Sequence, residues 1–384
     1  MIVLSLLLAL TYLLFLLWLR NGLTTINKSS NVNYLQDTVD SPKVSVIVAV
    51  RNEATNIATL LEHLLNQSYP REQYEIVIAD DGSTDDTNNI ITSIAKNESR
   101  LKYLKVDDIP AGWAPKKWAL SQGVKISSGE ILIFTDADCT MDTEWITQII
   151  NCFADRQIRM VAAPSPLQNG NSMWNRMLLL DSIGQDALTA GGLSRNLPLT
   201  ISGRNLAIRR TAFDSVKGYE GIQSFISGDD DLMMHKIAHH GLKLHFCLLS
   251  EAEVKSPPPS NFKAFVQQRL RFASKGKSYF NLPFVSHHFR WILILIYLTN
   301  LGVVLGQAMT LLSSNQTWLL PWFLKISGDG ILIYKYTSTL RRPFDIPAFL
   351  LSEIWHSLYV VVLGALGSFL PVFWKGRKEN IKIA

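Results

Sequence analysis

Three clusters of aspartates are the side chains of this sequence with the clearest capacity for chemistry. Their members are Asp80, Asp81, Asp85 and Asp86, then Asp136 and Asp138, and then Asp229, Asp230 and Asp231. Carboxylates placed this densely repel one another unless a cation or hydrogen bonds offset their charge. A hard divalent ion such as Mg²⁺ binds carboxylate oxygens and leaves positions for phosphate, so an Asp-x-Asp pair at a strand end indicates a metal site. The alternative, in which the aspartates only cap helices in solvated turns, stays open for each cluster.

Alternating strand and helix patterns surround these clusters and predict an α/β fold. β-branched and apolar runs predict strands at 43–51, 74–80, 101–106 and 130–138, with helices between them, among them 85–96 and 113–126. Such alternation favours a parallel sheet covered by helices on both faces, with ligands at the carboxyl ends of the strands. Neither GxxxxGK[ST] nor GxGxxG follows a strand, which argues against a P-loop ATPase and a Rossmann dehydrogenase.

Apolar segments at both ends of the chain predict a membrane protein. Residues 1–19 and 291–312 carry no charge and, at about 1.5 Å per residue, are long enough to cross a bilayer core of about 30 Å. A third run within 347–374 is predicted to span as well. The stretch 318–336 is apolar but holds Lys325 and Asp329 in its interior, so spanning, re-entrant and interfacial placements all remain open.

The charges beside the first apolar run predict its orientation. Arg20 and Lys28 follow the run instead of preceding it, which favours an uncleaved anchor and a cytoplasmic middle domain in a multi-pass protein of the cell membrane. The predicted organisation is an anchor at 1–19, a linker at 20–42, a catalytic domain at 43–285 with an interfacial helix at 262–280, a C-terminal membrane region at 286–374 with two or three spans, and a basic tail at 375–384.

Composition narrows the class of partner. The chain has 384 residues, 47% apolar and 18% charged, and its 37 basic and 32 acidic side chains give a formal charge of only +5. This charge does not imply nucleic-acid binding. The three cysteines, Cys139, Cys152 and Cys247, are too few for a disulfide framework and lack zinc-site spacing, which fits a reducing compartment.

Five ordered motifs between about residues 44 and 272 resemble a known family. They are VSVIVAVRNEA, IVIADDGSTDDT, GWAPKKWAL, FTDADC, and SGDDD followed by QRLRF. In this order the motifs resemble those of the membrane-anchored family 2 glycosyltransferases. The resemblance implies a GT-A fold, related to the Rossmann fold, flanked by transmembrane helices, and an inverting hexosyltransferase that depends on a nucleotide sugar.

The resemblance also implies a binding site for the sugar donor. Asp81 matches the acid that contacts the nucleoside, and Arg51 and Glu53 lie on the loop that lines the same pocket. A UDP-sugar is the expected donor. Helix capping by the DDGSTDD turn is the competing interpretation of this segment.

The diphosphate side of the donor site is implied by two further motifs. Lys116 takes the position of the lysine in the family's GKxxAL pattern, with Lys117 as a neighbour that could substitute. Asp136 and Asp138 match the family's D-x-D, which holds Mn²⁺ or Mg²⁺ against the two phosphates. Such a cation stabilises the charge that develops on the leaving diphosphate.

The last motif pair implies the catalytic base. Asp229 and Asp230 take the place of the family's Glu-Asp pair, in which the second acid removes the proton of the acceptor hydroxyl, and Asp231 is an off-register candidate. Gln268 and Arg271 match the family's QxxRW, with phenylalanine in place of tryptophan, and place Arg271 near the diphosphate. An interfacial helix bound to anionic lipid is the alternative interpretation of this basic segment.

A membrane-associated, lipid acceptor follows from the apolar ends, because the nucleotide sugar itself is water-soluble. Transfer of a single sugar to a lipid is favoured over a processive polysaccharide synthase, which needs enough helices to form a channel. A non-catalytic metal-binding membrane module is the alternative from another class, and Lys116 and Arg271 argue against it, because a cation site has no need of basic side chains beside its acids. Helix 173–193, with its MLLL run, is a candidate for the acceptor entrance, and an ordinary buried helix is the alternative.

Overall fold

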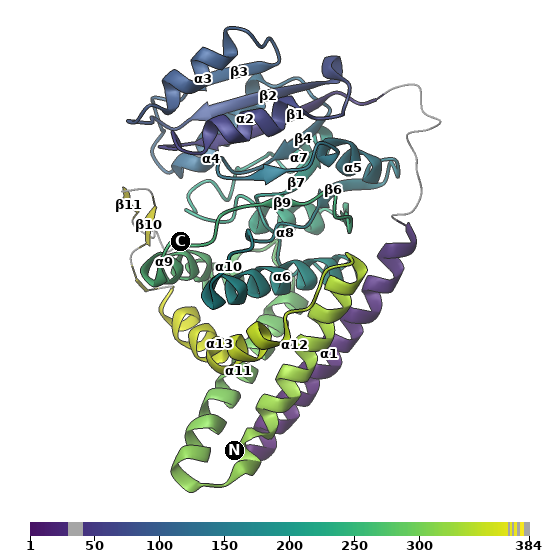
Figure 1. The fold of residues 1–384 in the computed structure, drawn as a ribbon, viewed down its shortest axis with the longest axis vertical. Coiled ribbons are helices and arrows are strands. Elements are labelled where there is room, and N and C mark those ends of the chain that lie inside the picture. Colours follow the sequence, from purple (N-terminus) through teal and green to yellow (C-terminus); the bar gives the residue numbers. More distant parts are fainter. Residues whose placement is uncertain (30–40, 368, 371, 375–376, 380–384) are drawn as a thin grey trace.

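The computed structural model describes residues 1–29, 41–367, 369–370, 372–374 and 377–379. They form an α/β domain that stands on long helices contributed by both ends of the chain (Figure 1). Much of the predicted linker at 20–42 and of the predicted basic tail at 375–384 lies outside the described residues.

A seven-stranded sheet forms the centre of the α/β domain. Its strands, in spatial order, are β3 (Leu101–Lys105), β2 (Tyr74–Asp80), β1 (Val44–Val50), β4 (Ile131–Phe134), β7 (Leu206–Arg209), β6 (Ile158–Ala162) and β8 (Lys243–Phe246). The four predicted strands pair in parallel, as expected. β7 lies outside the predicted alternation and runs antiparallel to both of its neighbours, so the sheet is mixed.

Helices cover both faces of the sheet because side chains alternate along the buried strands. Val46 and Val48 of β1 belong to the core on one face, whereas Ile47 belongs to the core on the other. The first face is covered by α2 (Ile57–Leu65), α3 (Thr87–Ala95) and α5 (Trp145–Cys152), and the second by α4 (Pro115–Ile126), α6 (Met173–Leu193) and α8 (Asp231–His239).

The predicted interfacial helix at 262–280 is divided into two helices, α9 (Phe262–Ala273) and α10 (Ser278–Asn281). The other short elements are η2 (Arg71–Gln73), β5 (Thr140–Met141), α7 (Arg210–Ser215), β9 (Val254–Lys255), η3 (Gln316–Leu319), β10 (Val372–Trp374) and β11 (Arg377–Glu379).

Four long helices carry the apolar ends of the chain. They are α1 (Ile2–Ser29), α11 (His287–Ser313), α12 (Leu320–Thr339) and α13 (Ile346–Leu366). In the described part of the chain, three helices are long and apolar enough to cross a membrane: 2–24, 287–313 and 346–366. α1 continues ten residues beyond the predicted anchor end at residue 19.

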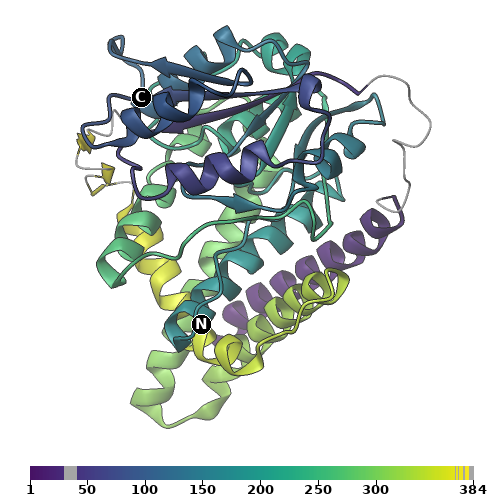
Figure 2. The same cartoon turned by 45° about the horizontal axis from the view of Figure 1, so that its top comes forward.

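The long helices are arranged differently from one another. α12 packs along α1, where Gly328 allows close contact with Leu13 and Leu16, and α11 also packs against both. Both views show α13 crossing the direction of α1 and α12 at a steep angle (Figures 1 and 2). α13 packs against α11, α9 and α6, so it lies between the helical group and the α/β domain.

Candidate active site

Lys116 lies at the centre of the candidate site and joins two of the aspartate clusters. It is in the first turn of α4, where Pro115 begins the helix. Its amine lies 3.0 Å from Asp136 Oδ1 and 2.8 Å from Asp229 Oδ2. Burial disfavours the charged amine, but the two carboxylates outweigh burial and raise the pKa of Lys116. The second and third acidic clusters therefore meet around one permanent cation.

Asp136 and Asp138 lie in the loop after β4, and both line a cavity of about 550 Å³. Among the residues that the structure describes, no three His, Cys, Asp or Glu side chains gather closely enough to hold a metal ion by themselves. Mg²⁺ and similar ions are commonly bound by one or two carboxylates together with substrate phosphates. The chemistry of this donor pair therefore fits a cation that is shared with a diphosphate.

Asp230 is the residue at the N-cap of α8, so the capping interpretation applies to it in part. Its Oδ1 accepts a hydrogen bond of 2.7 Å from the Asp231 amide, and its Oδ2 accepts one of 2.9 Å from the Gly203 amide. Gly228, just before the acids, has a φ of +88°, and a Cβ there would lie 2.7 Å from the Leu232 side chain. Glycine is thus required where the loop turns toward the helix.

Charge distinguishes Asp230 from the acids on either side of it. Asp229 is paired with Lys116, and Asp231 accepts from the Lys275 amine at 2.7 Å and from the Tyr279 hydroxyl. Burial opposes ionisation of both, but the neighbouring cations outweigh it and lower the pKa of Asp229 and of Asp231.

Asp230 makes no ion pair among the described residues, and its pKa is shifted upward, opposite to the pKa of Asp229 and of Asp231. Removal from water, reinforced by the charges of Asp231 and Asp229, raises the pKa of Asp230 to about 6. Asp230 is therefore the acid of this cluster that can exchange a proton near neutral pH.

Lys117 is not available to substitute for Lys116. Its buried amine donates to the carbonyl oxygens of Phe225 and Ser227, the latter at 2.7 Å, and burial lowers its pKa to about 8. Lys117 instead fixes the loop that leads to Asp229. Adjacent residues of a helix point about 100° apart, which is why only one of the two lysines reaches the cavity.

The three predicted nucleoside-binding residues gather at the carboxyl ends of β1 and β2. The Arg51 guanidinium donates to the carbonyl oxygens of Asp81 and Gly82 and lies 3.9 Å from the Asp81 carboxylate. Glu53 is buried and accepts from the Asn56 side chain at 2.7 Å. These residues do not line the cavity that contains Lys116. The predicted donor residues therefore form two groups, one at the carboxyl ends of β1 and β2 and one in the cavity around Lys116.

The remaining predicted site residues come from α9. Gln268 and Arg271 both line the cavity, as do Phe272 and Lys275. Asn205 is buried and donates to the Pro164 and Ala252 carbonyl oxygens, so its role is to hold the loop.

The structure adds two residues that the motifs did not indicate. The interfacial interpretation assigned the cations of 262–280 to lipid, but Lys275 is buried against Asp231, and Arg269 is buried against Asp181 of α6. The sequence signal available was the complete absence of Asp and Glu within this basic segment, since its cations then need partners elsewhere. Asp181 itself lies in the helix considered for an acceptor entrance.

Comparisons with known proteins agree with the fold and the motifs. The family model described as "Glycosyl transferase family group 2" matches residues 131–370, more than half of the chain, and the one described as "Glycosyl transferase family 2" matches residues 45–216. The mannosyltransferase PcManGT from Pyrobaculum calidifontis, solved in complex with GDP-Man and Mn²⁺, has a TM-score of 0.55 at 15% identity and covers 94% of this chain and 98% of its own.

Curated relatives point in the same direction. The beta-monoglucosyldiacylglycerol synthase of Nostoc sp. is 32% identical over 197 residues, which are 50% of this chain and 40% of that protein, so the match spans less than half of the synthase. The probable glycosyltransferase YdaM of Bacillus subtilis is 23% identical over 89% of this chain and 86% of its own length. The poly-beta-1,6-N-acetyl-D-glucosamine synthase of Staphylococcus epidermidis is 27% identical over 61% and 54%. With motifs, fold and family models in agreement, the chain belongs to the family 2 glycosyltransferases and has the GT-A fold.

Proposed function

We propose that this glycosyltransferase moves one sugar from a nucleotide-diphosphate donor to a lipid acceptor, with inversion at the anomeric carbon. The observation that carries the proposal is the Asp230 carboxylate, which has no ion pair among the described residues and lines the same cavity as Lys116, Asp136 and Asp138. A base and a diphosphate site within one cavity are the two requirements of a single displacement.

In this mechanism Asp230 accepts the proton of the acceptor hydroxyl. The hydroxyl oxygen forms its bond to the anomeric carbon as the bond from that carbon to the donor phosphate breaks, and the nucleoside diphosphate leaves. A divalent cation, Mn²⁺ or Mg²⁺, held by Asp136 and Asp138 would supply stabilisation of the charge on the diphosphate. Lys116 keeps Asp136 and Asp229 neutralised, and Arg271 adds a cation from α9.

The donor nucleoside is assigned to the group formed by Arg51, Glu53 and Asp81. Their position at the carboxyl ends of β1 and β2 is where α/β folds of this type bind nucleotides. A UDP-sugar remains the expected donor.

Membrane attachment supports a lipid acceptor and a cytoplasmic catalytic domain. The cavity is lined not only by the catalytic acids but also by Tyr12 of α1, Asn300 of α11 and Leu332 of α12. An acceptor that resides in the membrane would reach Asp230 along these helices. A multi-pass arrangement is supported by the three described helices that are long and apolar enough to span.

The proposed function predicts metal-dependent transfer in a defined assay. Purified full-length protein in detergent would be supplied with UDP- or GDP-sugars, Mn²⁺ or Mg²⁺ and a lipid extract, and nucleoside diphosphate release and labelled lipid would be followed together. We expect one labelled sugar per lipid acceptor by mass spectrometry. Products carrying a ladder of added sugars would instead show a processive synthase, and the absence of transfer and of donor hydrolysis would support a non-catalytic module.

The raised pKa of Asp230 predicts the pH dependence. The base must be ionised to act, so kcat/KM should rise about tenfold per pH unit up to about pH 6 and level off above it. The measurement is kcat/KM for the donor between pH 4.5 and about 8, with circular dichroism at each pH as the control for unfolding. A profile that is flat across this interval in folded protein would rule out Asp230 as the titrating base.

A further inference from the structure

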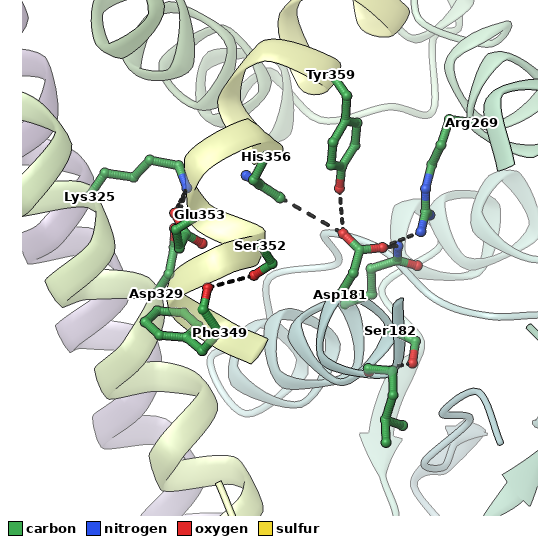
Figure 3. Close-up of polar contacts among 12 residues, drawn as sticks. Asp181, Ser182, Arg269, Lys325, Asp329, Phe349, Ser352, Glu353, His356 and Tyr359 are labelled. Atoms are coloured by element: carbon green, nitrogen blue, oxygen red, sulfur yellow. Dashed lines mark hydrogen bonds and ion pairs between the residues drawn. The ribbon is translucent and has the colours of Figure 1, made fainter. Parts of the chain in front are cut away.

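At the end formed by helices α6, α9, α12 and α13, the cavity is lined by a group of buried and half-buried ionisable side chains. Figure 3 shows its labelled members, with Asp181 facing α13 and α9. The lining there includes Asp181, Arg269, Asp329, Glu353, His356 and Tyr359. An ionisable side chain placed among apolar helices costs free energy because it is removed from water. Such residues are therefore candidates for a function. Neither the donor nor the catalytic base requires them.

Asp181 is the central acceptor of this group. Its carboxylate receives hydrogen bonds from the Arg269 guanidinium and the Tyr359 hydroxyl, and the His356 imidazole lies 4.0 Å away. Arg269 has no other carboxylate partner among the described residues. The charge of Arg269 is thus cancelled by a single acid.

A second set of contacts neutralises the remaining lysine of this region. The Lys325 amine, which is fully buried, lies 2.6 Å from Asp329 and 2.6 Å from Glu353. Tyr12 donates a hydrogen bond of 2.7 Å to Asp329. With two carboxylates around one amine, this set carries no excess positive charge.

Among the residues that the structure describes, every lysine and arginine at this end of the cavity is already paired with a carboxylate. Lys275 is engaged by Asp231, and the lining arginines without a carboxylate partner in the described part of the chain, Arg204 and Arg271, belong to the catalytic end. Arg204 follows Gly203, whose amide binds Asp230, and Arg271 lies four residues before Lys275, which binds Asp231. A phosphate brought beside Asp181 would find three carboxylates whose cations are already paired, and burying an uncompensated charge there is strongly unfavourable.

Unpartnered polar atoms at the same end suit hydroxyl groups. Asn300 is 1% exposed and lines the cavity, and its Oδ1 has no hydrogen-bond partner among the described residues. Trp355 Nε1, in the same lining, is a donor with no acceptor among the described residues. A hydroxyl can both donate and accept, whereas an ionised phosphate only accepts and leaves a carbonyl oxygen such as that of Asn300 unsatisfied.

From these contacts we infer that the membrane end of the cavity selects a lipid acceptor with an uncharged, hydroxyl-bearing headgroup, and that the Asp181–Arg269 pair sets this selectivity. The inference rests on the proposed function, because it concerns the acceptor of the same transfer. The apolar lining residues Met177, Leu188, Ile296, Leu332 and Leu363 provide the surface for the lipid chains. Asp181 acts as a positioning residue: its charge keeps Arg269 from attracting an anionic headgroup.

The test compares lipids that differ only by a phosphate. Full-length protein in detergent would be given the established donor with diacylglycerol or phosphatidic acid of the same acyl chains, and with polyprenol or polyprenyl phosphate. We expect kcat/KM for an uncharged member to exceed that for its phosphate. In Asp181→Asn, which frees Arg269, kcat/KM for the uncharged acceptor should fall roughly tenfold, mainly through a higher KM. The ratio of kcat/KM for the phosphate to kcat/KM for the uncharged acceptor should rise. Donor hydrolysis without acceptor should not change.

The matched control is Asp345→Asn. Asp345 forms a bidentate pair with Arg176, at 2.6 and 2.7 Å, which also joins α6 to the beginning of α13 but does not line the cavity. It should leave acceptor preference unchanged. Equal losses for both acceptor classes in Asp181→Asn, or a wild-type preference for the phosphates, would overturn the inference while the proposed function stands. Absence of transfer to every acceptor with every donor would overturn both.

Discussion

Asp230→Asn is expected to reduce sugar transfer by about 10³-fold or more while the protein stays folded. The amide has the shape of the carboxylate but cannot accept the proton of the acceptor hydroxyl. It can still accept one of the two backbone hydrogen bonds, from Gly203 or from Asp231. Because burial and two neighbouring acids disfavour the Asp230 charge, removing that charge costs little stability. The measurements are kcat for transfer and the midpoint of thermal unfolding.

Measuring donor affinity distinguishes loss of the catalytic base from disruption of the site. Asp230→Asn should bind the nucleoside diphosphate with unchanged affinity, because Lys116, Asp136 and Asp138 are untouched. Asp155→Asn, which alters a partly exposed acid paired with Lys243, is the matched control and should retain full activity. If Asp230→Asn keeps more than about a tenth of wild-type activity, the base is another group.

Asp138→Asn is expected to remove metal-dependent transfer almost completely. One carboxylate is then left to share a cation with the diphosphate, and the charge on the leaving group is poorly stabilised; the loss should be on the order of 10²-fold or more. Chelation by EDTA should abolish wild-type transfer, and Mn²⁺ should restore it in wild type but not in the variant.

The affinity for Mn²⁺ should also depend on the nucleoside diphosphate. Because no third His, Cys, Asp or Glu joins the pair among the described residues, Mn²⁺ should bind tightly only in the presence of the nucleoside diphosphate. Titration calorimetry with and without the diphosphate tests this directly. Asp142→Asn, four residues along and solvent-exposed, is the control because asparagine can keep its hydrogen bond to the Glu144 amide. Undiminished transfer in EDTA would exclude a metal role for the pair.

The sequence predicted those parts of the fold that depend on local patterns. Strand β2 begins and ends at the predicted residues, because a short, largely apolar and β-branched run is typical of a parallel strand that helices cover on both faces. The meeting of Asp136 and Asp229 around Lys116 was implied by motif order but not by any local pattern. Ninety-three residues separate the two acids along the chain, and only the completed sheet brings them together.

The partners of the cations in the basic segment 262–280 could not be predicted from sequence alone. Lys275 and Arg269 have the spacing of a lipid-facing helix, but their partners, Asp231 and Asp181, lie 44 and 88 residues away. Whether a cation faces lipid or a distant acid depends on tertiary packing. Tertiary packing also explains why two lysines that are neighbours in sequence differ: Lys116 pairs with Asp136 in the cavity, whereas Lys117 donates to the Ser227 carbonyl oxygen.

The core on the second face of the sheet does not end at the boundary of the α/β domain. It runs from Ile47 of β1 through Ala187 of α6 to Leu16 and Leu19 of α1 as one continuous buried cluster. Gly191 of α6 lies so close to α1 that a Cβ there would come within 3.0 Å of the Leu19 side chain. The N-terminal helix is therefore part of the hydrophobic core of the α/β domain as well as an apolar segment. A fragment cut at residue 43 would leave part of its own interior facing water. We therefore expect the smallest cooperatively folding unit of this enzyme to include a helix that is also long and apolar enough to cross a membrane.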